Sequence, residues 1–293
     1  MPEVSDPDAY WSKPLRGVND AAGELQQYGI VIDLQQFSQS SPQSFVEKAE
    51  LILSKNPEGV VLAPFFSREA RDFVEKLDAL KIPYVFIDSN IDECNKLSFI
   101  GQNSFQCGTL AAKLFDYSLP DDSKILIIHF GKELDNQNHP KQREIGFYNY
   151  FNAKPEGTGK NLFTSEIEIA PNEDLFKTID HEIDKLGGVN GIFVTNSQVY
   201  RIAEYVVSRN MQPIRLLGHD LIRQNAEFLQ TGVIDFLICQ RPEEQGHEAV
   251  LTLFDHIILK KQVRTDNYTS IDIVTKENLT YYKEFNLSNY GTY

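Results

Sequence analysis

Three polar residues that can each make several hydrogen bonds stand at the ends of short apolar runs. They are Asn196, Asp220 and Gln240, and amphipathic helical patterns alternate with the runs. Short apolar runs that alternate with helices predict a parallel sheet. The carboxyl ends of parallel strands share one edge, where α/β sheets bind their ligands. We therefore expect a cleft that binds a small molecule rich in hydroxyl groups, and binding is favoured over catalysis.

The elements that must position these residues follow from the apolar periodicity of the whole chain. Helices are expected at 11–28, 42–53, 67–80, 104–115, 143–151, 174–186 and 243–259, and after the strands that begin at 191 and 214. Strands are expected at 29–37, 59–65, 82–88, 97–101, 125–130, 163–169 and 234–240, and from 191 and 214. This order predicts an α/β fold with two doubly wound parallel-sheet lobes. Only residues 1–4 precede the first helix where a strand would be expected, so we expect the natural chain to extend upstream.

Length and charge limit the classes of function. The 293 residues suit two domains of ordinary size, and the formal net charge is −14, from 42 acidic and 28 basic residues. Such a charge repels nucleic-acid phosphates and anionic membranes, so we expect no DNA binding by these residues alone.

Cysteine usage and hydropathy indicate the compartment. Cys94, Cys107 and Cys239 form no CxxC pair, so neither a disulfide framework nor a zinc site is expected. Free thiols are typical of a reducing cytoplasm. No apolar run reaches the ~20 residues of a membrane span, and the N-terminus does not resemble a secretion signal.

Seven short segments, taken in order, resemble the effector-binding part of lac-repressor-type transcription regulators, which share their fold with periplasmic sugar-binding proteins. They are Asp8–Trp11, Pro83–Asp88, Ile100–Gly108, Arg143–Phe147, Thr195–Ser197, Gly218–Asp220 and Gln240–Pro242. The resemblance runs from Asp8 to about Tyr282. It implies two lobes with the ligand cleft between them, the architecture of type I periplasmic binding proteins.

The resemblance also implies how the chain is divided and assembled. Residues 1–103 with 242–266 would form the first lobe, and residues 104–241 with 267–293 the second. A DNA-binding helix-turn-helix would precede residue 1, so operator DNA would be reached only through that absent domain. A homodimer is expected, paired through helices at Glu69–Leu80 and Arg223–Gln230, because two headpieces read a two-fold operator. The same helices could instead bury their apolar stripes within one chain.

Family position and side-chain chemistry together select the site residues. Hydroxyl groups of a sugar both donate and accept, which calls for carboxylates, a guanidinium and amides. The polar candidates are Asp88, Asn103, Arg143, Asn196, Asp220 and Gln240, and the candidates for flat apolar contact are Tyr10, Trp11 and Phe65. Each has a structural alternative: the Asp and Asn residues could cap helices or turns, the arginine could form a surface ion pair, and Trp11 could fill the core.

Three positions depart from the common family pattern. Ala63 replaces a polar residue, Asn103 replaces an aspartate, and His219 replaces an aromatic residue. His219 is therefore added to the candidate ligand-binding residues. The hydroxyl pattern that this chain reads should differ from that of the well-known pentose and hexose sites.

Signals for catalysis are weak throughout the sequence. No Gly-x-Ser-x-Gly elbow and no HExxH spacing occurs, and the segment at 157–160 lacks the spacing of a phosphate-binding loop. We expect no catalytic residues, no metal and no cofactor.

Three functions compete. The leading interpretation is the sugar- or polyol-sensing domain of a cytoplasmic bacterial regulator, in which lobe closure changes DNA binding upstream. The alternative is an extracytoplasmic sugar receptor of a transporter or a sensor kinase. An enzyme on a related fold, such as a sugar hydrolase or isomerase, comes third.

Overall fold

The computed structural model describes residues 1–4, 6, 8–131, 138–155, 159–168, 171–211 and 213–282. The chain divides into two compact units. Unit 1 comprises Met1–Asn103, Asp135–His139 and Gln240–Ser270, and unit 2 comprises Ser104–Leu134, Pro140–Cys239 and Ile271–Tyr293. The predicted boundaries placed residues 138–139, 240–241 and 267–270 in the second lobe, whereas the structure groups them with unit 1. Residues 240–241 and 267–270 belong there because the last strand of unit 1 extends to Tyr268, and because the carbonyl of Gln240 accepts a hydrogen bond from Thr269 Oγ1 at 3.3 Å.

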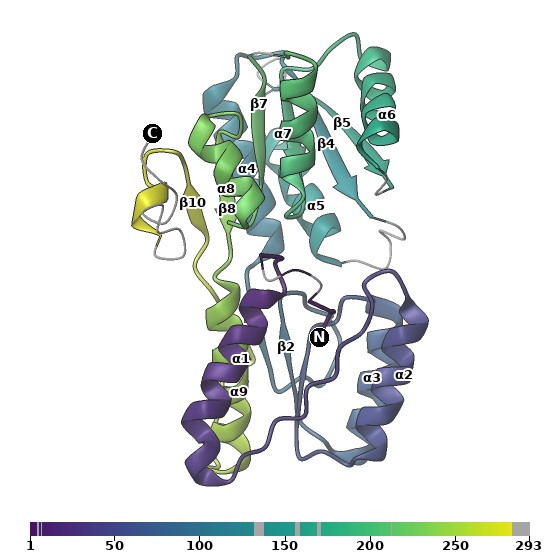
Figure 1. The fold of residues 1–293 in the computed structure, drawn as a ribbon, viewed down its shortest axis with the longest axis vertical. Coiled ribbons are helices and arrows are strands. Elements are labelled where there is room, and N and C mark those ends of the chain that lie inside the picture. Colours follow the sequence, from purple (N-terminus) through teal and green to yellow (C-terminus); the bar gives the residue numbers. More distant parts are fainter. Residues whose placement is uncertain are drawn as a thin grey trace. The chain divides into compact units, whose positions relative to one another are not determined.

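Unit 1 is a four-stranded sheet between two pairs of helices (Figure 1). Its helices are α1 (Ser12–Leu25), α2 (Pro42–Ser54), α3 (Ser67–Leu80) and α9 (Pro242–Ile257), with a 3-10 turn η1 (Gln26–Tyr28). Its strands are β1 (Val60–Leu62), β2 (Tyr84–Ile87), β3 (Ser98–Gly101) and β9 (Asp266–Tyr268), in the order β1-β2-β3-β9 with every pair parallel.

Strand β2 shows how the two faces of this sheet are covered. Its side chains alternate, so Tyr84 and Phe86 enter the core beneath α2 and α3, whereas Val85 and Ile87 enter the core beneath α1 and α9. All four residues are buried, as expected for a central strand of a parallel sheet.

The strand predicted at 29–37 is not formed, and this prediction was wrong. Among the described residues, the segment pairs only near its end, where Phe37 makes an isolated parallel bridge with Pro2. A strand requires a hydrogen-bonded neighbour along its length. Before Gln35 this segment has no ladder partner within the described ranges, although its apolar residues follow the pattern of a strand.

Unit 2 is a larger sheet in the order β10-β8-β7-β6-β4-β5, parallel except for the antiparallel edge strand β10. Its strands are β4 (Lys124–Phe130), β5 (Asn161–Ile167), β6 (Gly191–Val194), β7 (Arg215–His219), β8 (Phe236–Cys239) and β10 (Asp272–Val274). Its helices are α4 (Ser104–Ser118), α5 (Asn138–Asn152), α6 (Asn172–Lys185), α7 (Val199–Ser208) and α8 (Arg223–Thr231), followed by the 3-10 turn η3 (Leu279–Tyr281). Helices α4 and α5 cover one face, and α6, α7 and α8 cover the other.

A close helix crossing braces each unit. In unit 1, a Cβ atom at Gly17 of α1 would lie 1.9 Å from the Glu243 carbonyl oxygen of α9, and one at Gly246 would lie 2.1 Å from that of Pro14. In unit 2, α4 and α5 meet in the same reciprocal way. A Cβ atom at Gly108 would lie 1.8 Å from the Arg143 carbonyl oxygen, and one at Gly146 would lie 2.0 Å from that of Phe105. Only glycine allows backbones to approach this closely.

Candidate functional site

Asp88 is the centre of the candidate residues in unit 1. It directly follows β2 and adopts a left-handed backbone conformation with φ +67°. Its amide donates to the Ile100 carbonyl at 3.3 Å and to Gln245 Oε1 at 3.0 Å. The hydroxyl of Tyr10 donates to its Oδ1 at 2.6 Å. The carboxylate is therefore held in place at the carboxyl end of the sheet.

Gln245 is a supporting residue that the sequence interpretation missed. Its side chain is fully buried on α9, and its Nε2 donates to the Gln240 carbonyl at 2.7 Å. The side-chain amide of Gln245 thus hydrogen-bonds the backbone just after β2, at Asp88, and the backbone just before α9, at Gln240. The available signal was a polar residue on the face of α9 that also buries Gly246 and Ala249. A buried amide with no partner would be costly, so its presence there indicates a hydrogen-bonding role.

The other candidate residues of unit 1 differ in how deeply they are buried. Trp11 is 5% exposed and packs in the core beneath α1 and α9, with an edge-on contact to Tyr10 at 5.1 Å between ring centroids. Phe65 is half-buried and lies edge-on to Phe66 at 5.0 Å. Asn103, at the end of this unit, is half-buried. The structural alternative left open for Trp11 therefore has direct support from its packing.

Arg143 is a buried cation of unit 2. It lies on α5, is 2% exposed, and donates from Nη1 to the Thr195 carbonyl at 2.6 Å, just after β6. Its Nε has no hydrogen-bond partner among the described residues. A buried guanidinium is stable only when its charge and its donors are matched. The unmatched donor indicates that this arginine has capacity left for a ligand.

A second network fixes the residue to which Arg143 donates. The Nδ1 atom of His129 lies 2.7 Å from Thr195 Oγ1, and its Nε2 lies 3.1 Å from Glu144 Oε2. The hydrogen bond with His129 holds the pKa of Glu144 below its usual value, despite partial burial that acts in the opposite direction. Thr164 also donates to Glu144, at 2.6 Å. These residues, which the sequence interpretation missed, make Thr195 a fixed anchor.

Asp220 and His219 end the next strand of unit 2. Asp220 has φ +67° and donates its amide to the Ile238 carbonyl at 3.0 Å, and His219 is fully buried against Phe193 at 5.7 Å between ring centroids. The side-chain amide of Asn225 donates to the carbonyls of both residues, at 3.0 and 2.8 Å. Asn225, on α8, was also missed by the sequence interpretation.

Asn196 uses its side chain within its own neighbourhood. Its Nδ2 donates to the Phe130 carbonyl at 3.0 Å, and its Oδ1 accepts from the Gln198 amide at 3.1 Å. The second contact is an Asx-type turn before α7, so the helix-start alternative for this residue has geometric support. One amide hydrogen remains for a ligand.

Three further features of the described residues bear on function: possible metal ligands, a buried thiol and the length of the helices. Across the described ranges, no group of three or more His, Cys, Asp or Glu residues is placed to hold a metal ion. Burial raises the pKa of the Cys107 thiol to about 11, so this thiol stays protonated and poorly nucleophilic at neutral pH. In the same part of the chain, no helix is long and apolar enough to cross a membrane.

Comparison with known families identifies the fold. Residues 1–261 match the model of the periplasmic binding protein domain. The chain belongs to this family. This membership agrees with the α/β architecture of parallel sheets predicted from the sequence. Among proteins with curated descriptions, no sequence matches the chain.

Solved structures of this periplasmic-binding-protein fold are similar over nearly the whole chain. A candidate LacI transcriptional regulator from Bacteroides fragilis is 31% identical, with a TM-score of 0.89 and 96% of each chain covered. A glucose-galactose binding protein from Geobacillus stearothermophilus is 18% identical, with a TM-score of 0.82 and coverage of 95% of this chain and 96% of that one. A solute-binding protein from Burkholderia graminis in complex with D-arabinose is 19% identical, with a TM-score of 0.81 and coverage of 96% and 95%.

The predicted site residues of this periplasmic-binding-protein-domain chain form two sets, one in each unit. Unit 1 carries Tyr10, Trp11, Phe65, Asp88, Asn103 and Gln240, and unit 2 carries Arg143, Asn196, His219 and Asp220. Both sets include a carboxylate at the carboxyl end of a central strand. In unit 2 the set combines a guanidinium donor, a carboxylate and an amide, and in unit 1 it combines a carboxylate with two amides, which are group types that recognise hydroxyl groups.

Proposed function

We propose that the chain binds a neutral sugar or related polyol, as the effector domain of a bacterial transcription regulator. The observation that carries the proposal is Arg143, a buried guanidinium with an unmatched Nε at the carboxyl end of a sheet. A planar guanidinium can bridge two neighbouring hydroxyl groups, and charged partners make each bond worth about 1.5–3 kcal/mol. The sugars named for two similar structures support the ligand class.

The regulator is favoured over a transport receptor by similarity. The relative described as a regulator is 31% identical, whereas the two sugar-binding proteins above are 18% and 19% identical. In the proposed mechanism, ligand-driven closure of the lobes changes the DNA binding of headpieces that precede the effector domain. The receptor remains the alternative, because the family model describes periplasmic binding proteins. The gene sequence ahead of residue 1 decides between them by encoding a helix-turn-helix or a secretion signal.

Calorimetry against a panel of neutral, acidic and phosphorylated sugars tests the ligand class. We expect micromolar binding of a neutral sugar or polyol, and binding confined to amino acids or nucleobases would reject the proposal. Arg143→Ala should weaken binding at least tenfold, about 1.4 kcal/mol. The matched control is Arg215→Ala, because Arg215 forms only a surface ion pair with Asp235. Circular dichroism of both variants separates a lost contact from lost folding.

Two further measurements address turnover and assembly. Mass spectrometry after incubation with stoichiometric protein should recover the sugar intact, and a converted sugar would favour an enzyme. Light scattering at tens of micromolar should show a homodimer, with α3 and α8 as the candidate interface helices. A strict monomer would favour the receptor. We also expect no DNA affinity at physiological salt for these residues alone, because of the −14 charge.

A further inference from the structure

A closed ring of hydrogen bonds joins four residues of unit 2. Helix α5 carries Arg143 and Glu144 next to each other, and their side chains reach different partners. Arg143 Nη1 donates to the Thr195 carbonyl at 2.6 Å, and Glu144 Oε2 lies 3.1 Å from His129 Nε2. The other ring nitrogen of His129 lies 2.7 Å from Thr195 Oγ1. The two branches therefore meet at Thr195, and the peptide bond between Arg143 and Glu144 closes the ring.

The hydroxyl of Thr195 indicates where the proton of His129 lies. This hydroxyl has two acceptors nearby, the Ile128 carbonyl at 3.4 Å and His129 Nδ1 at 2.7 Å. Hydroxyl donors form their hydrogen bonds at about 2.5–3.0 Å, so the hydroxyl donates to His129. An imidazole nitrogen that accepts a hydrogen bond carries no proton, so the proton of the neutral ring is on Nε2.

Glu144 leads to the same assignment from the other side of the ring. Its hydrogen bond with His129 holds the pKa of this carboxyl below its usual value, so Glu144 is ionised at neutral pH. An ionised carboxylate only accepts hydrogen bonds, so the nitrogen that faces it must carry a proton. That nitrogen is Nε2 of His129.

Carboxylate, imidazole and hydroxyl in this order resemble the triad of a hydrolase, in which the hydroxyl attacks a substrate. Burial excludes that role here, because Thr195 is 0% exposed and His129 is 3% exposed, which leaves a substrate no approach to the hydroxyl. All three polar groups of Thr195 are engaged, since its amide also donates to the Ile128 carbonyl at 3.2 Å. The ring therefore holds the Thr195 backbone in place.

We propose that His129, with its proton on Nε2, is a positioning residue for Arg143, and that Glu144 sets this tautomer. Thr195 lies one residue beyond β6, where the strand ends, and the hydrogen bond with His129 fixes its orientation there. A planar guanidinium that is held at Nη1 aims its other donors in fixed directions, and the Nε of Arg143 has no partner among the described residues. The proposal rests on the proposed function only in taking the ligand as the partner of that Nε.

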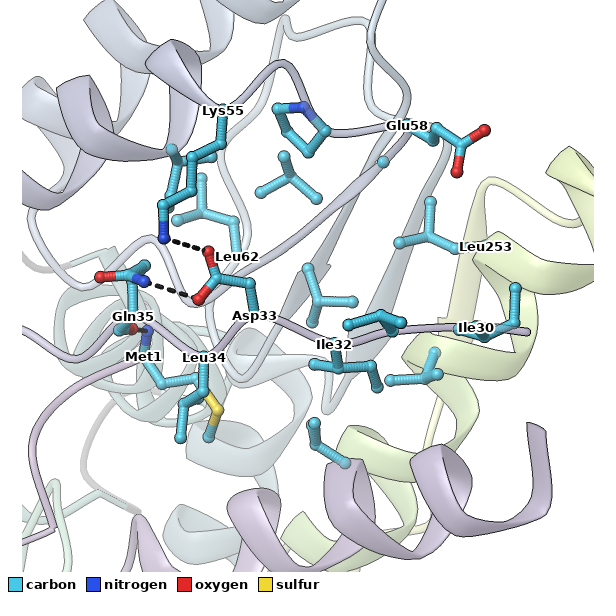
Figure 2. Close-up of a pocket in the computed structure, with 18 of the residues that line it drawn as sticks. Met1, Ile30, Ile32, Asp33, Leu34, Gln35, Lys55, Glu58, Leu62 and Leu253 are labelled. Atoms are coloured by element: carbon cyan, nitrogen blue, oxygen red, sulfur yellow. Dashed lines mark hydrogen bonds and ion pairs between the residues drawn. The ribbon is translucent and has the colours of Figure 1, made fainter. Parts of the chain in front are cut away.

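Unit 1 supplies a matched control for the carboxylate of Glu144. Asp33 lies at the wall of a cavity of about 550 Å³ and accepts from Lys55 at 2.5 Å and from Gln35 at 2.8 Å (Figure 2). Like Glu144, it is a carboxylate with two side-chain partners, but Asp33 and Lys55 are both exposed. Asp33→Ala and Glu144→Ala remove the same charge, and only the second opens the ring.

Nitrogen NMR of the histidine rings tests the tautomer without a ligand. At mildly alkaline pH we expect His129 to carry its proton on Nε2 only, and a proton on Nδ1 would overturn the proposal. Glu144→Ala should raise the share of the form protonated on Nδ1, because the carboxylate no longer faces Nε2. Asp33→Ala should leave the His129 signals unchanged, and equal spectra for the two variants would contradict the role of Glu144.

Calorimetry with the neutral sugar that binds most tightly in the panel tests the positioning of Arg143. His129→Phe removes the acceptor of the Thr195 hydroxyl and should weaken binding about fivefold, the size of one net hydrogen bond. His129→Asn should lose less than about twofold, because its Oδ1 is as many bonds from the backbone as Nδ1 and can accept from the same hydroxyl. Equal losses for the two variants would overturn the proposal.

A double-mutant cycle separates positioning from packing. In an Arg143→Lys background, His129→Phe should change the affinity by less than about twofold, because a lysine ammonium has no plane to orient. The full loss in both backgrounds would show that His129 does not act through Arg143.

The Arg143 signal tests the arrangement even if the unmodified chain binds no sugar, a result that would reject the proposed function. The Nε–H resonance of Arg143 is the one that Arg143→Lys removes. It should exchange with water faster in His129→Phe than in His129→Asn, because only the asparagine still holds Thr195. Equal exchange in the two variants would overturn the positioning role of His129.

Discussion

The two units each place an aspartate at the carboxyl end of a central strand, and the backbone geometry of the two aspartates is the same. Asp88 in unit 1 and Asp220 in unit 2 both follow a central strand, and both have φ +67°. Each donates its amide to a carbonyl of the neighbouring strand, Ile100 in one case and Ile238 in the other. Aspartate tolerates this left-handed conformation better than most residues. The repeated use of a strained backbone at both carboxyl ends indicates that the direction of these side chains matters.

The residues that hold the ends of these strands differ between the units. In unit 1, Asp88 accepts from Tyr10, and Gln245 makes one bond at each end of its amide. In unit 2, Asn225 holds three carbonyls and one amide, whereas Arg143 keeps an unmatched Nε. Unit 2 therefore combines a more rigid support with a cation that has capacity left.

The largest expected effect tests whether both units depend on their glycine crossings. Gly17→Ala in unit 1 and Gly146→Ala in unit 2 should each lower the free energy of unfolding by about 3 kcal/mol, because the added Cβ meets a backbone carbonyl that cannot move alone. Chemical denaturation measures the loss. Gly23→Ala is the control on the same helix as Gly17, since nothing lies within 4 Å of its Cβ position. It should stabilise by up to about 0.5–1 kcal/mol, and a comparable loss there would refute the crossing argument.

The next largest effect is the loss of stability when the buried side-chain amide of Asn225 or of Gln245 is removed. Asn225→Leu should cost about 2–3 kcal/mol, because three carbonyls and the Tyr200 amide lose their partner. Gln245→Met should cost about 1 kcal/mol less. Its two partners each keep another bond, from the Asp88 amide to Ile100 and from Thr269 to the Gln240 carbonyl. Denaturant midpoints of the two variants make the comparison, and a larger loss for Gln245→Met would reverse the assignment of the more rigid support to unit 2.

The periodic pattern of apolar residues was enough to predict the α/β class and most elements. Periodicity records which face of an element is buried, and that is a local property. The segment at 29–37 failed because its pattern is that of a strand while its pairing depends on a neighbour elsewhere in the chain. Gln245 and Asn225 were missed for a similar reason. Their importance lies in carbonyls that become neighbours only after folding.

A smaller effect concerns acid stability and the buried network around Glu144 in unit 2. The pKa of Glu144 is lowered by its hydrogen bond with His129, so its contribution is present above its ordinary pKa and is lost as the pH falls through the lowered value. Glu144→Gln should therefore make the loss of stability between pH 6 and pH 3 smaller than in the unmodified chain. Urea denaturation across this range measures it. Glu173→Gln, at an exposed helical pair with Lys177, should leave the slope unchanged.

The smallest expected effect is on ligand affinity, and it tests whether the Tyr10–Asp88 hydrogen bond contributes to ligand binding or only to the stability of the fold. Tyr10→Phe removes the hydroxyl that orients the carboxylate, so we expect affinity to fall about threefold, or ~0.7 kcal/mol. Tyr205→Phe is the matched control, because it removes a hydroxyl that donates to Asp180 at 2.8 Å in unit 2, between α7 and α6 rather than at a strand end. Both variants should lose about 1 kcal/mol of stability, and only the first should change affinity by calorimetry. Equal affinities in the two variants would confine Tyr10 to a structural role and leave Asp88 to be oriented by its backbone alone.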